Sequence, residues 1–270
     1  MIFITIIIAL AIEILVNHPQ RMRNMSWLMT YRNWVVKLFG KSTSWNGTVG
    51  VLGVVAIPLV ILKIIQSTST FSDLMYGFFG ILLGVLVLIY CLRYRAMYQL
   101  VDELSVDSKN AITQMQLKTL AQELLGETQV SKDPNRTLTE QVIIQANERL
   151  FAVIFWFVIL GPMGALMYRM AWYLKDNPLS LPDSHSAGAD VTDDTEDNFN
   201  SAAVKLYAIL SWIPARLTAF AYALAGGFED AFGSWKEPGF SEEYNIIQSN
   251  HSILKGTGLG ALRLSRYETG

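Results

Sequence analysis

The sequence predicts an all-α fold: a polytopic membrane helix bundle of about five membrane segments, with a cytoplasmic helical hairpin attached. The first observation is composition, since 51% of the 270 residues are hydrophobic and only 16% are charged. An ordinary soluble domain carries about 25% charged residues, and the mean hydropathy here is +0.31. The second observation is that residues 150–168 contain no charge. Their length matches the roughly 20 apolar residues that a helix needs to cross a bilayer. We therefore expect the lipid bilayer to be a partner of this protein.

The uncharged stretch lies within residues 147–172, around which we expect the bundle to be organised. Gly161, Pro162 and Gly164 interrupt it. Proline lacks a backbone N–H and usually kinks a helix, and a bilayer tolerates such a kink only where neighbours satisfy the freed carbonyl. The motif predicts a kinked span that packs inside a bundle, and an ordinary kinked membrane anchor is the alternative.

Three further apolar stretches precede this central one. Residues 1–16 are short for a full crossing and predict a tilted or partly embedded helix, whereas residues 47–65 and 74–92 are long enough to span. In the last of these, Gly80 and Gly84 form a small-residue face that permits close contact between helices.

The link between the first two apolar stretches, residues 17–46, is basic. This link and the first three apolar stretches together form an N-terminal region of residues 1–95. It contains five cations and no acid: Arg21, Arg23, Arg32, Lys37 and Lys41. It also contains three tryptophans spaced like interfacial anchors: Trp27, Trp34 and Trp45. The positive-inside rule places such a link in the cytoplasm, and a site for an anionic ligand is the alternative.

Residues 96–146 are amphipathic and predict the cytoplasmic helical hairpin. Leucines recur at helical spacing in the first half, and residues 132–135 then break the chain. Thr137 and Glu140 have the spacing of a capping box. We therefore expect a second helix to start there and to continue without a breaker into the central span, projecting from the membrane.

The central and last spans occupy residues 147–228, with an acidic loop at residues 176–203 between them. The loop contains seven acids and no Lys or Arg. Because this composition cannot build a core, it predicts a solvated, mobile loop outside the cytoplasm, with weak binding of a divalent cation as the alternative. The last span covers about residues 204–228, and residues 229–270 form a polar cytoplasmic tail. Five crossings would then leave the N-terminus outside.

Arg216, near the middle of the last span, is the strongest candidate for a binding residue. An unpaired cation in a bilayer costs at least about 2.5 kcal/mol, and a guanidinium keeps its charge, so it must find an anion. Glu148 and Glu13 are the nearest acids by topology, and a bound phosphate or lipid headgroup is the other solution. The alternative is that the Arg216 side chain reaches the membrane interface by snorkelling and forms no binding site. The candidate ligand-binding residues are Glu148, Arg216, Asn250, Gly256, Gly258 and Gly260.

The totals exclude several other functions. A net charge of −2 argues against a nucleic-acid partner, which would require a basic face. Cys91 is the single cysteine, so the sequence holds no internal disulfide and no spacing typical of zinc sites or thiol redox chemistry. We predict no metal site, no catalytic residue and no cofactor, and a partner that is another membrane or cytoplasmic protein.

Three motifs in the second half of the chain occur in a characteristic order. Residues 155–168 contain Phe-Trp followed by Gly-Pro-Met-Gly-Ala-Leu-Met-Tyr, residues 213–218 read Ile-Pro-Ala-Arg-Leu-Thr, and Asn250 precedes a glycine-rich tract at residues 256–262. Together these motifs resemble the AmpE/CobD-CbiB family of bacterial inner-membrane proteins, over roughly residues 140–265. The resemblance implies a multi-pass protein of the bacterial inner (cytoplasmic) membrane.

That family has two branches, and the resemblance implies a different function for each. The synthase branch joins an aminopropanol phosphate to adenosylcobyric acid with ATP in cobalamin synthesis. The AmpE branch is described as a membrane modulator of β-lactamase induction, linked to the sensing of cell-wall recycling. ATP therefore enters as a ligand by resemblance only.

The sequence departs from the synthase branch at several motifs. An Asp-Pro…His-Pro-Val signature is reduced to Glu13 and His18-Pro19, and a Glu-Asn-x-x-Asp run is similar to residues 144–148, where the acid is Glu148. A Thr-Leu-Asp motif corresponds to residues 173–175, which end in a lysine. Because Mg²⁺-ATP needs hard oxygen ligands, that exchange is damaging. Relatives also usually end with a further span, which does not follow here before the sequence ends.

These departures favour one branch. We predict a regulatory modulator of the AmpE branch, not an enzyme, and the alternative is a membrane enzyme of the adenosylcobinamide-phosphate synthase type.

Overall fold

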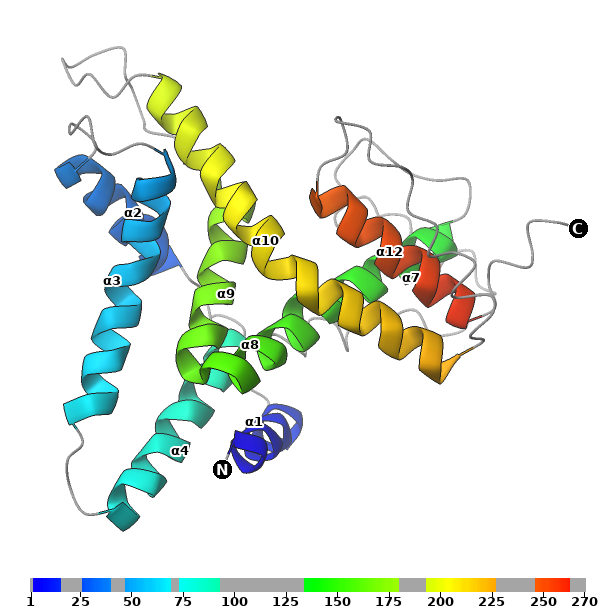
Figure 1. The fold of residues 1–270 in the computed structure, drawn as a ribbon, viewed down its shortest axis with the longest axis horizontal. Helices are drawn as coiled ribbons and strands as arrows, with labels where there is room; N and C mark the ends of the chain where they lie inside the picture. Colours follow the sequence, from blue (N-terminus) through cyan, green and yellow to red (C-terminus); the bar gives the residue numbers. More distant parts are fainter. Residues whose placement is uncertain are drawn as a thin grey trace, which may run out of the picture. The chain divides into compact units, whose positions relative to one another are not determined.

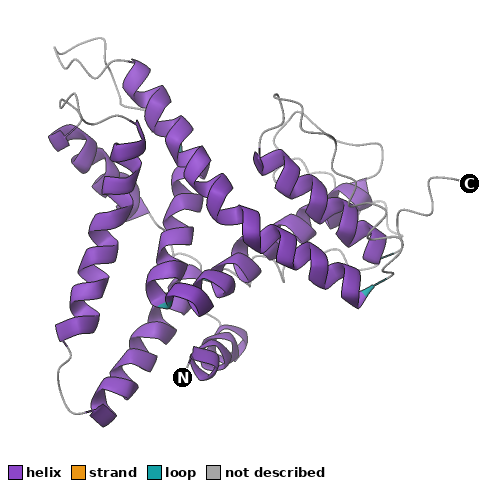
Figure 2. Cartoon of the chain, viewed as in Figure 1, coloured by secondary structure: helices purple, strands orange, loops and turns teal. Residues whose placement is uncertain are grey.

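The structure is a computed structural model that describes residues 2–15, 26–39, 47–68, 73–92, 134–179, 193–226 and 246–262. Within these ranges the regular secondary structure is entirely helical (Figures 1 and 2), which confirms the predicted all-α class. The helices are α1 (Ile2–Leu15), α2 (Ser26–Phe39), α3 (Gly47–Thr68), α4 (Asp73–Cys91), α7 (Pro134–Ala146), η2 (Asn147–Phe151), α8 (Ala152–Leu160), α9 (Pro162–Asp176), α10 (Asp193–Ala225) and α12 (Ile246–Ala261).

Three of the described helical stretches are long and apolar enough to cross a membrane: Gly47–Ser67, Thr139–Leu160 and Glu196–Ala225. Two shorter apolar helices, Ile2–Leu15 and Phe78–Cys91, accompany them. The expected spans at the second, third and last positions therefore correspond to helices. The expected central span does not keep its bounds, because the apolar helix there ends at Leu160.

The chain turns at Gly161, where φ is +66°. Residues that carry a side chain rarely adopt this backbone conformation, whereas glycine does so readily. Gly164 then lies so close to α8 that an added Cβ would overlap the carbonyl oxygen of Trp156. In Figure 1, α9 leaves this corner in a different direction from α8. The predicted single kinked span at residues 150–168 is therefore wrong, since two separate helices meet at a glycine.

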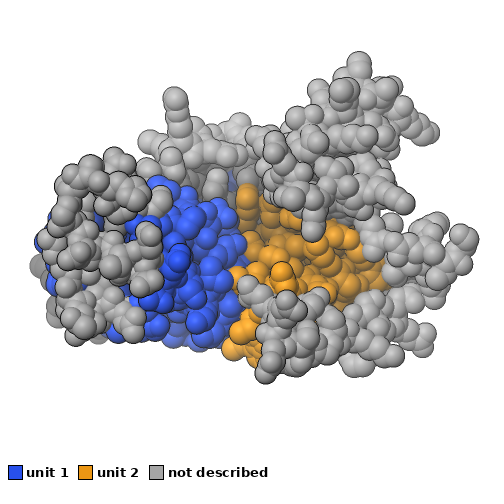
Figure 3. All heavy atoms as spheres, turned by 90° about the horizontal axis from the view of Figure 1, so that it is seen from above, with its two compact units in different colours: residues 1–92, 153–210 blue, residues 93–152, 211–270 orange. Residues whose placement is uncertain are grey.

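The chain forms two compact units: residues 1–92 with 153–210, and residues 93–152 with 211–270 (Figure 3). The first unit contains an apolar core shared by α2, α3, α9 and α10. Its fully buried members include Leu28, Val35, Val54, Met170 and Ala203. Residues 17–46 were expected to be a link, but their described part is a helix with one face in this core.

The acidic stretch before the last span is helical from Asp193 onward, so the prediction of a loop extending to residue 203 is wrong for that part. Burial explains the difference, because Phe199 and Ala203 are 1% and 0% exposed. Asn200 also holds the end of the preceding segment, accepting from the N–H of Leu179 at 2.6 Å and donating to its carbonyl at 3.1 Å. Residues 180–192 lie outside the described residues.

The basic and acidic segments lie at the same end of the first unit. Nη1 of Arg32 in α2 donates to the carbonyl oxygen of Asn177, just after α9, at 2.6 Å. An added Cβ at Gly47, the first residue of α3, would overlap the carbonyl of Asn198 in α10. The expectation that these segments occupy opposite sides of the membrane stays a prediction. It assumed a single crossing through residues 147–172, whereas the chain turns at Gly161 between α8 and α9.

The second unit contains α7, η2, α12 and the C-terminal half of α10. Helical structure is continuous from Pro134 to Leu160, as predicted, although it begins before Thr137 because proline is well suited to a first helical position. The rest of the expected hairpin, residues 96–133, lies outside the described residues. A small core holds the unit together: Ile143, Ala215, Ala219, Ile253 and Leu254.

The expected polar tail at residues 229–270 contains a packed helix, α12. Leu254 and Thr257 on it are 0% exposed, and its last residue, Ala261, approaches Gly226 closely. Glycine weakens an isolated helix, and three glycines lie near the end of α12. Packing against α7 and α10 stabilises the helix despite them, so part of the expected tail is a packed helix.

Candidate functional site

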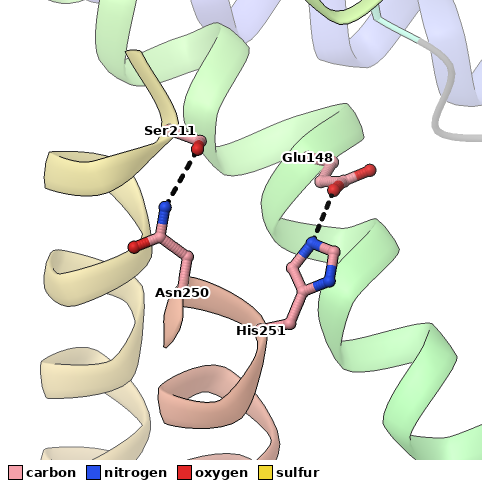
Figure 4. A network of polar contacts seen from close by, with 4 residues as sticks. All are labelled: Glu148, Ser211, Asn250 and His251. Carbon is pink, nitrogen blue, oxygen red and sulfur yellow. Dashed lines mark hydrogen bonds and ion pairs between the residues drawn. The ribbon is translucent and has the colours of Figure 1, made fainter. Parts of the chain in front are cut away.

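Polar side chains from η2, α10 and α12 meet inside the second unit. Figure 4 shows four of them, with Glu148 on η2, Ser211 on α10, and Asn250 and His251 on α12. Buried polar groups carry a large free-energy penalty unless they are hydrogen-bonded. Their partners therefore define how the site is built.

The segment η2 is a π-helix, and it brings two consecutive polar residues into the interior. Asn147 is 2% exposed and Glu148 is 7% exposed. Asn147 accepts a hydrogen bond from Oγ1 of Thr218 on α10 at 2.9 Å, whereas Glu148 points to α12 (Figure 4). Single π-turns inside α-helices occur frequently at functional sites. Two consecutive residues of this segment thus contact two different helices.

Glu148 pairs with His251, since its Oε1 lies 3.0 Å from Nε2 of the imidazole. The carboxylate side chain is 10% exposed and the imidazole is 30% exposed. When the imidazole carries a proton on Nε2 it donates to the carboxylate, and when it is doubly protonated the contact becomes an ion pair. The pair joins η2 to the first half of α12 (Figure 4).

Arg216 and Asn250, both predicted site residues, are in direct contact. Nη1 of Arg216 donates to Oδ1 of Asn250 at 2.9 Å and to the carbonyl of Trp212 at 3.3 Å. Its guanidinium carbon lies 4.0 Å from the centre of the Trp212 ring, a distance at which a cation is attracted to the aromatic face. Nδ2 of Asn250 then donates to Oγ of Ser211 at 3.0 Å, so both ends of this buried amide are fixed.

The three predicted glycines all lie in the second half of α12. Gly258 faces Ile143 of α7, so at that position the absence of a side chain serves helix packing. Gly260 is buried and Gly256 is partly buried. Beside them, Nζ of Lys255 lies 3.1 Å from Oε2 of Glu140 on α7. This is a charged contact between α7 and α12.

Four residues of the cluster were not identified from the sequence: Asn147, Ser211, Thr218 and His251. A signal for them existed, because Asn147 and His251 directly adjoin the predicted Glu148 and Asn250. Thr218 ends the same hexapeptide that contains Arg216. What the sequence could not show was that His251 is the partner of Glu148.

Lys175, which the resemblance sets against a carboxylate of the synthase branch, lies in the first unit among aromatic rings. Its Nζ is 4.7 Å from the centre of the Tyr207 ring and 5.9 Å from that of Trp172. The guanidinium of Arg169 lies 4.2 Å from the same Trp172 ring. This surrounding stabilises cations.

Comparison with known proteins decides the family. A sequence model described as "Regulatory signalling modulator protein AmpE" matches residues 1–248. The chain belongs to the AmpE family. The match includes Glu148 and Arg216 and stops just before Asn250.

Curated relatives of this AmpE-family chain include two proteins named "Cobalamin biosynthesis protein CobD". The one from Chromobacterium violaceum is 28% identical over 130 residues, which is 48% of this chain and 37% of the relative. The one from Stutzerimonas stutzeri is 30% identical over 101 residues, or 37% and 30% respectively. The similarity thus spans about a third of the length of these relatives. No solved structure matches the chain.

Proposed function

We propose that this AmpE-family protein is a multi-pass regulatory modulator of the bacterial inner membrane, linked to β-lactamase induction and cell-wall recycling. The observation that carries the proposal is the family match, which covers residues 1–248. Three long apolar helices and two shorter ones support a multi-pass arrangement.

The polar cluster of the second unit supports a role in regulation, because its contacts can be exchanged for contacts to a ligand. Arg216 and His251 supply donors, and Glu148 and Asn250 supply acceptors, from three helical segments. A polar or anionic ligand that takes over one of these contacts alters how α12 is held to α10 and η2. A ligand changes a conformational equilibrium only through such differential contacts. The proposed modulator passes that change to another membrane or cytoplasmic protein.

The second candidate is a membrane enzyme of the adenosylcobinamide-phosphate synthase type. The two relatives named as cobalamin biosynthesis proteins favour it. The surroundings of Lys175 weigh against it, because an aromatic and cationic environment stands where that branch has a carboxylate. Mg²⁺-ATP requires oxygen ligands, so we keep the regulatory function as the main proposal.

A deletion strain tests the proposal. We expect that removing the gene alters β-lactamase activity after exposure to an inducing β-lactam, and that expressing the full chain restores it. In parallel, the purified full chain is incubated with ATP, adenosylcobyric acid and an aminopropanol phosphate. Formation of adenosylcobinamide phosphate would move the function to the synthase branch. An unchanged induction response in the deletion strain would overturn the regulatory proposal.

A further inference from the structure

Helix α2 has two chemically different faces. Leu28, Val35 and Val36 are buried in the core of the first unit. The opposite face exposes Trp27, Thr30, Trp34 and Leu38 at helical spacing, as expected for side chains that share one side of a helix. Trp34 is 57% exposed and Leu38 is 55% exposed. We call these four residues the outer stripe.

Contacts with three neighbours place α2 at one end of the first unit. Nε1 of Trp27 donates to the hydroxyl of Tyr90, next to the end of α4, at 2.6 Å. The hydroxyl of Tyr31 donates to the carbonyl of Val54 in α3 at 3.3 Å, and Arg32 contacts Asn177 just after α9, as described above. Figure 1 shows α2 beside the beginning of α3. Helix α2 therefore lies near the point where α3 begins and where α4 and α9 end.

The length of α2 excludes a crossing of its own. Its 14 residues measure about 21 Å at the rise of an α-helix, whereas the hydrocarbon core of a bilayer is about 30 Å thick. It also contains Arg32, which is 3% exposed. Burial lowers the pKa of that guanidinium, and the neighbouring Tyr173 and then Glu196 oppose this effect. The arginine faces inward, so it does not interrupt the outer stripe.

We propose that α2 is an interfacial helix whose outer stripe lies in the boundary between the headgroups and the acyl chains of the bilayer that α3 crosses. Tryptophan prefers this boundary because its ring is apolar and its N–H is polar. Besides the buried Arg32, the segment that contains α2 has four cations and no acid, which complements the anionic lipids of a cytoplasmic leaflet.

The neighbouring helix supports lipid as the occupant of this face. In its first two turns α3 exposes Val49 and Leu52, at 54% and 51%. Because α3 is long and apolar enough to span, the bilayer begins at the level of these residues. The outer stripe lies next to that level, since α2 packs on α3. The surface of the bilayer can therefore cover the outer stripe, and no protein partner is needed for this.

Spin labels test this position in the full chain. Thr30, Trp34 and Leu38 are each replaced by cysteine in a Cys91→Ala background, and the protein is placed in vesicles of phosphatidylethanolamine and phosphatidylglycerol. All three positions are exposed, so a label there leaves the core intact. Asp197→Cys is the matched control, because Asp197 is exposed near the beginning of α10, next to Asn198, whose carbonyl lies against the first residue of α3.

The measurement is the ratio of collisions with oxygen, which dissolves in lipid, to collisions with a water-soluble nickel chelate. We expect a several-fold higher ratio at all three positions of the outer stripe than at residue 197. Free access of nickel to the stripe would overturn the proposal in favour of a solvated helix. Protection from both reagents would overturn it in favour of a protein partner or a second copy of the chain.

Discussion

Gly258 of α12 lies directly against Ile143 of α7, since a Cβ added at Gly258 would be 2.7 Å from Cδ1 of the isoleucine. The obstacle consists of side-chain atoms of Ile143, with further atoms at 3.0 Å and 3.2 Å. A side chain can shift or be shortened, whereas a backbone cannot. The contact can therefore be tested by compensation.

Gly258→Ala is expected to lower the free energy of unfolding by up to about 2 kcal/mol, because overpacking costs about 1–3 kcal/mol and alanine regains about 0.8–1.0 kcal/mol of helix propensity over glycine. Ile143→Val should restore part of this loss in the double variant, because it removes the nearest atom. Thermal unfolding in detergent measures the effect. Gly80→Ala is the matched control, since an added Cβ there meets nothing within 4 Å. Equal losses at both glycines would contradict the packing role of Gly258.

The contact between Arg216 and Asn250 gives a second prediction. Arg216→Leu removes a donor to a buried amide oxygen and should cost about 1–3 kcal/mol. Arg216→Lys keeps the charge but loses the planar guanidinium, so its effect should be intermediate. Stability in detergent and the induction response are measured together. Leu217→Val is the control, because Leu217 is 51% exposed on the same helix.

If Arg216→Leu leaves both stability and the induction response unchanged, the site interpretation is wrong and the arginine is a surface residue. If only stability changes, the arginine has a structural role alone. Loss of the response in Arg216→Lys, with stability near that of the wild type, would indicate a requirement for the guanidinium itself.

The pair of Glu148 and His251 gives a third prediction. In a double-mutant cycle with Glu148→Gln and His251→Gln, contacting residues typically show a coupling of about 0.5–3 kcal/mol. We expect a value toward the lower end, because the imidazole is 30% exposed and solvent screens exposed charges. Unfolding of the four proteins in detergent measures the coupling. Additive losses would show that the two residues act independently.

The long uncharged runs were enough to predict the apolar helices, because a bilayer imposes a length and a composition that can be read directly. The same rule failed to predict the turn within residues 150–168, because the sequence stays apolar on both sides of it. The turn is visible only in the backbone, where Gly161 has a positive φ. Composition also failed to predict the helical structure just before Phe199 and in α12. In both places burial of a few apolar residues outweighs the polar or glycine-rich surroundings.

The candidate site was partly predictable for a similar reason. Arg216 was identified because a cation within an apolar span requires a partner, and the structure brings it to Asn250. His251 was missed because a single histidine in a polar segment has no distinctive pattern. The π-turn at Asn147 was also missed, because its residues have the same hydrophobic pattern as an ordinary α-helix.

The hydrogen bond from Arg32 to Asn177 gives a last prediction, about sidedness. Because this contact holds α2 against the end of α9, we expect protease sites inserted at residues 17–25 and 180–192 to be cut from the same side of the membrane. A site at residues 69–72, after the far end of α3, is the control and should be cut from the opposite side. The assay compares sealed inside-out and right-side-out vesicles. Cleavage of the first two sites from opposite sides would restore the topology expected from charge alone and would contradict the packing of α2 against the end of α9.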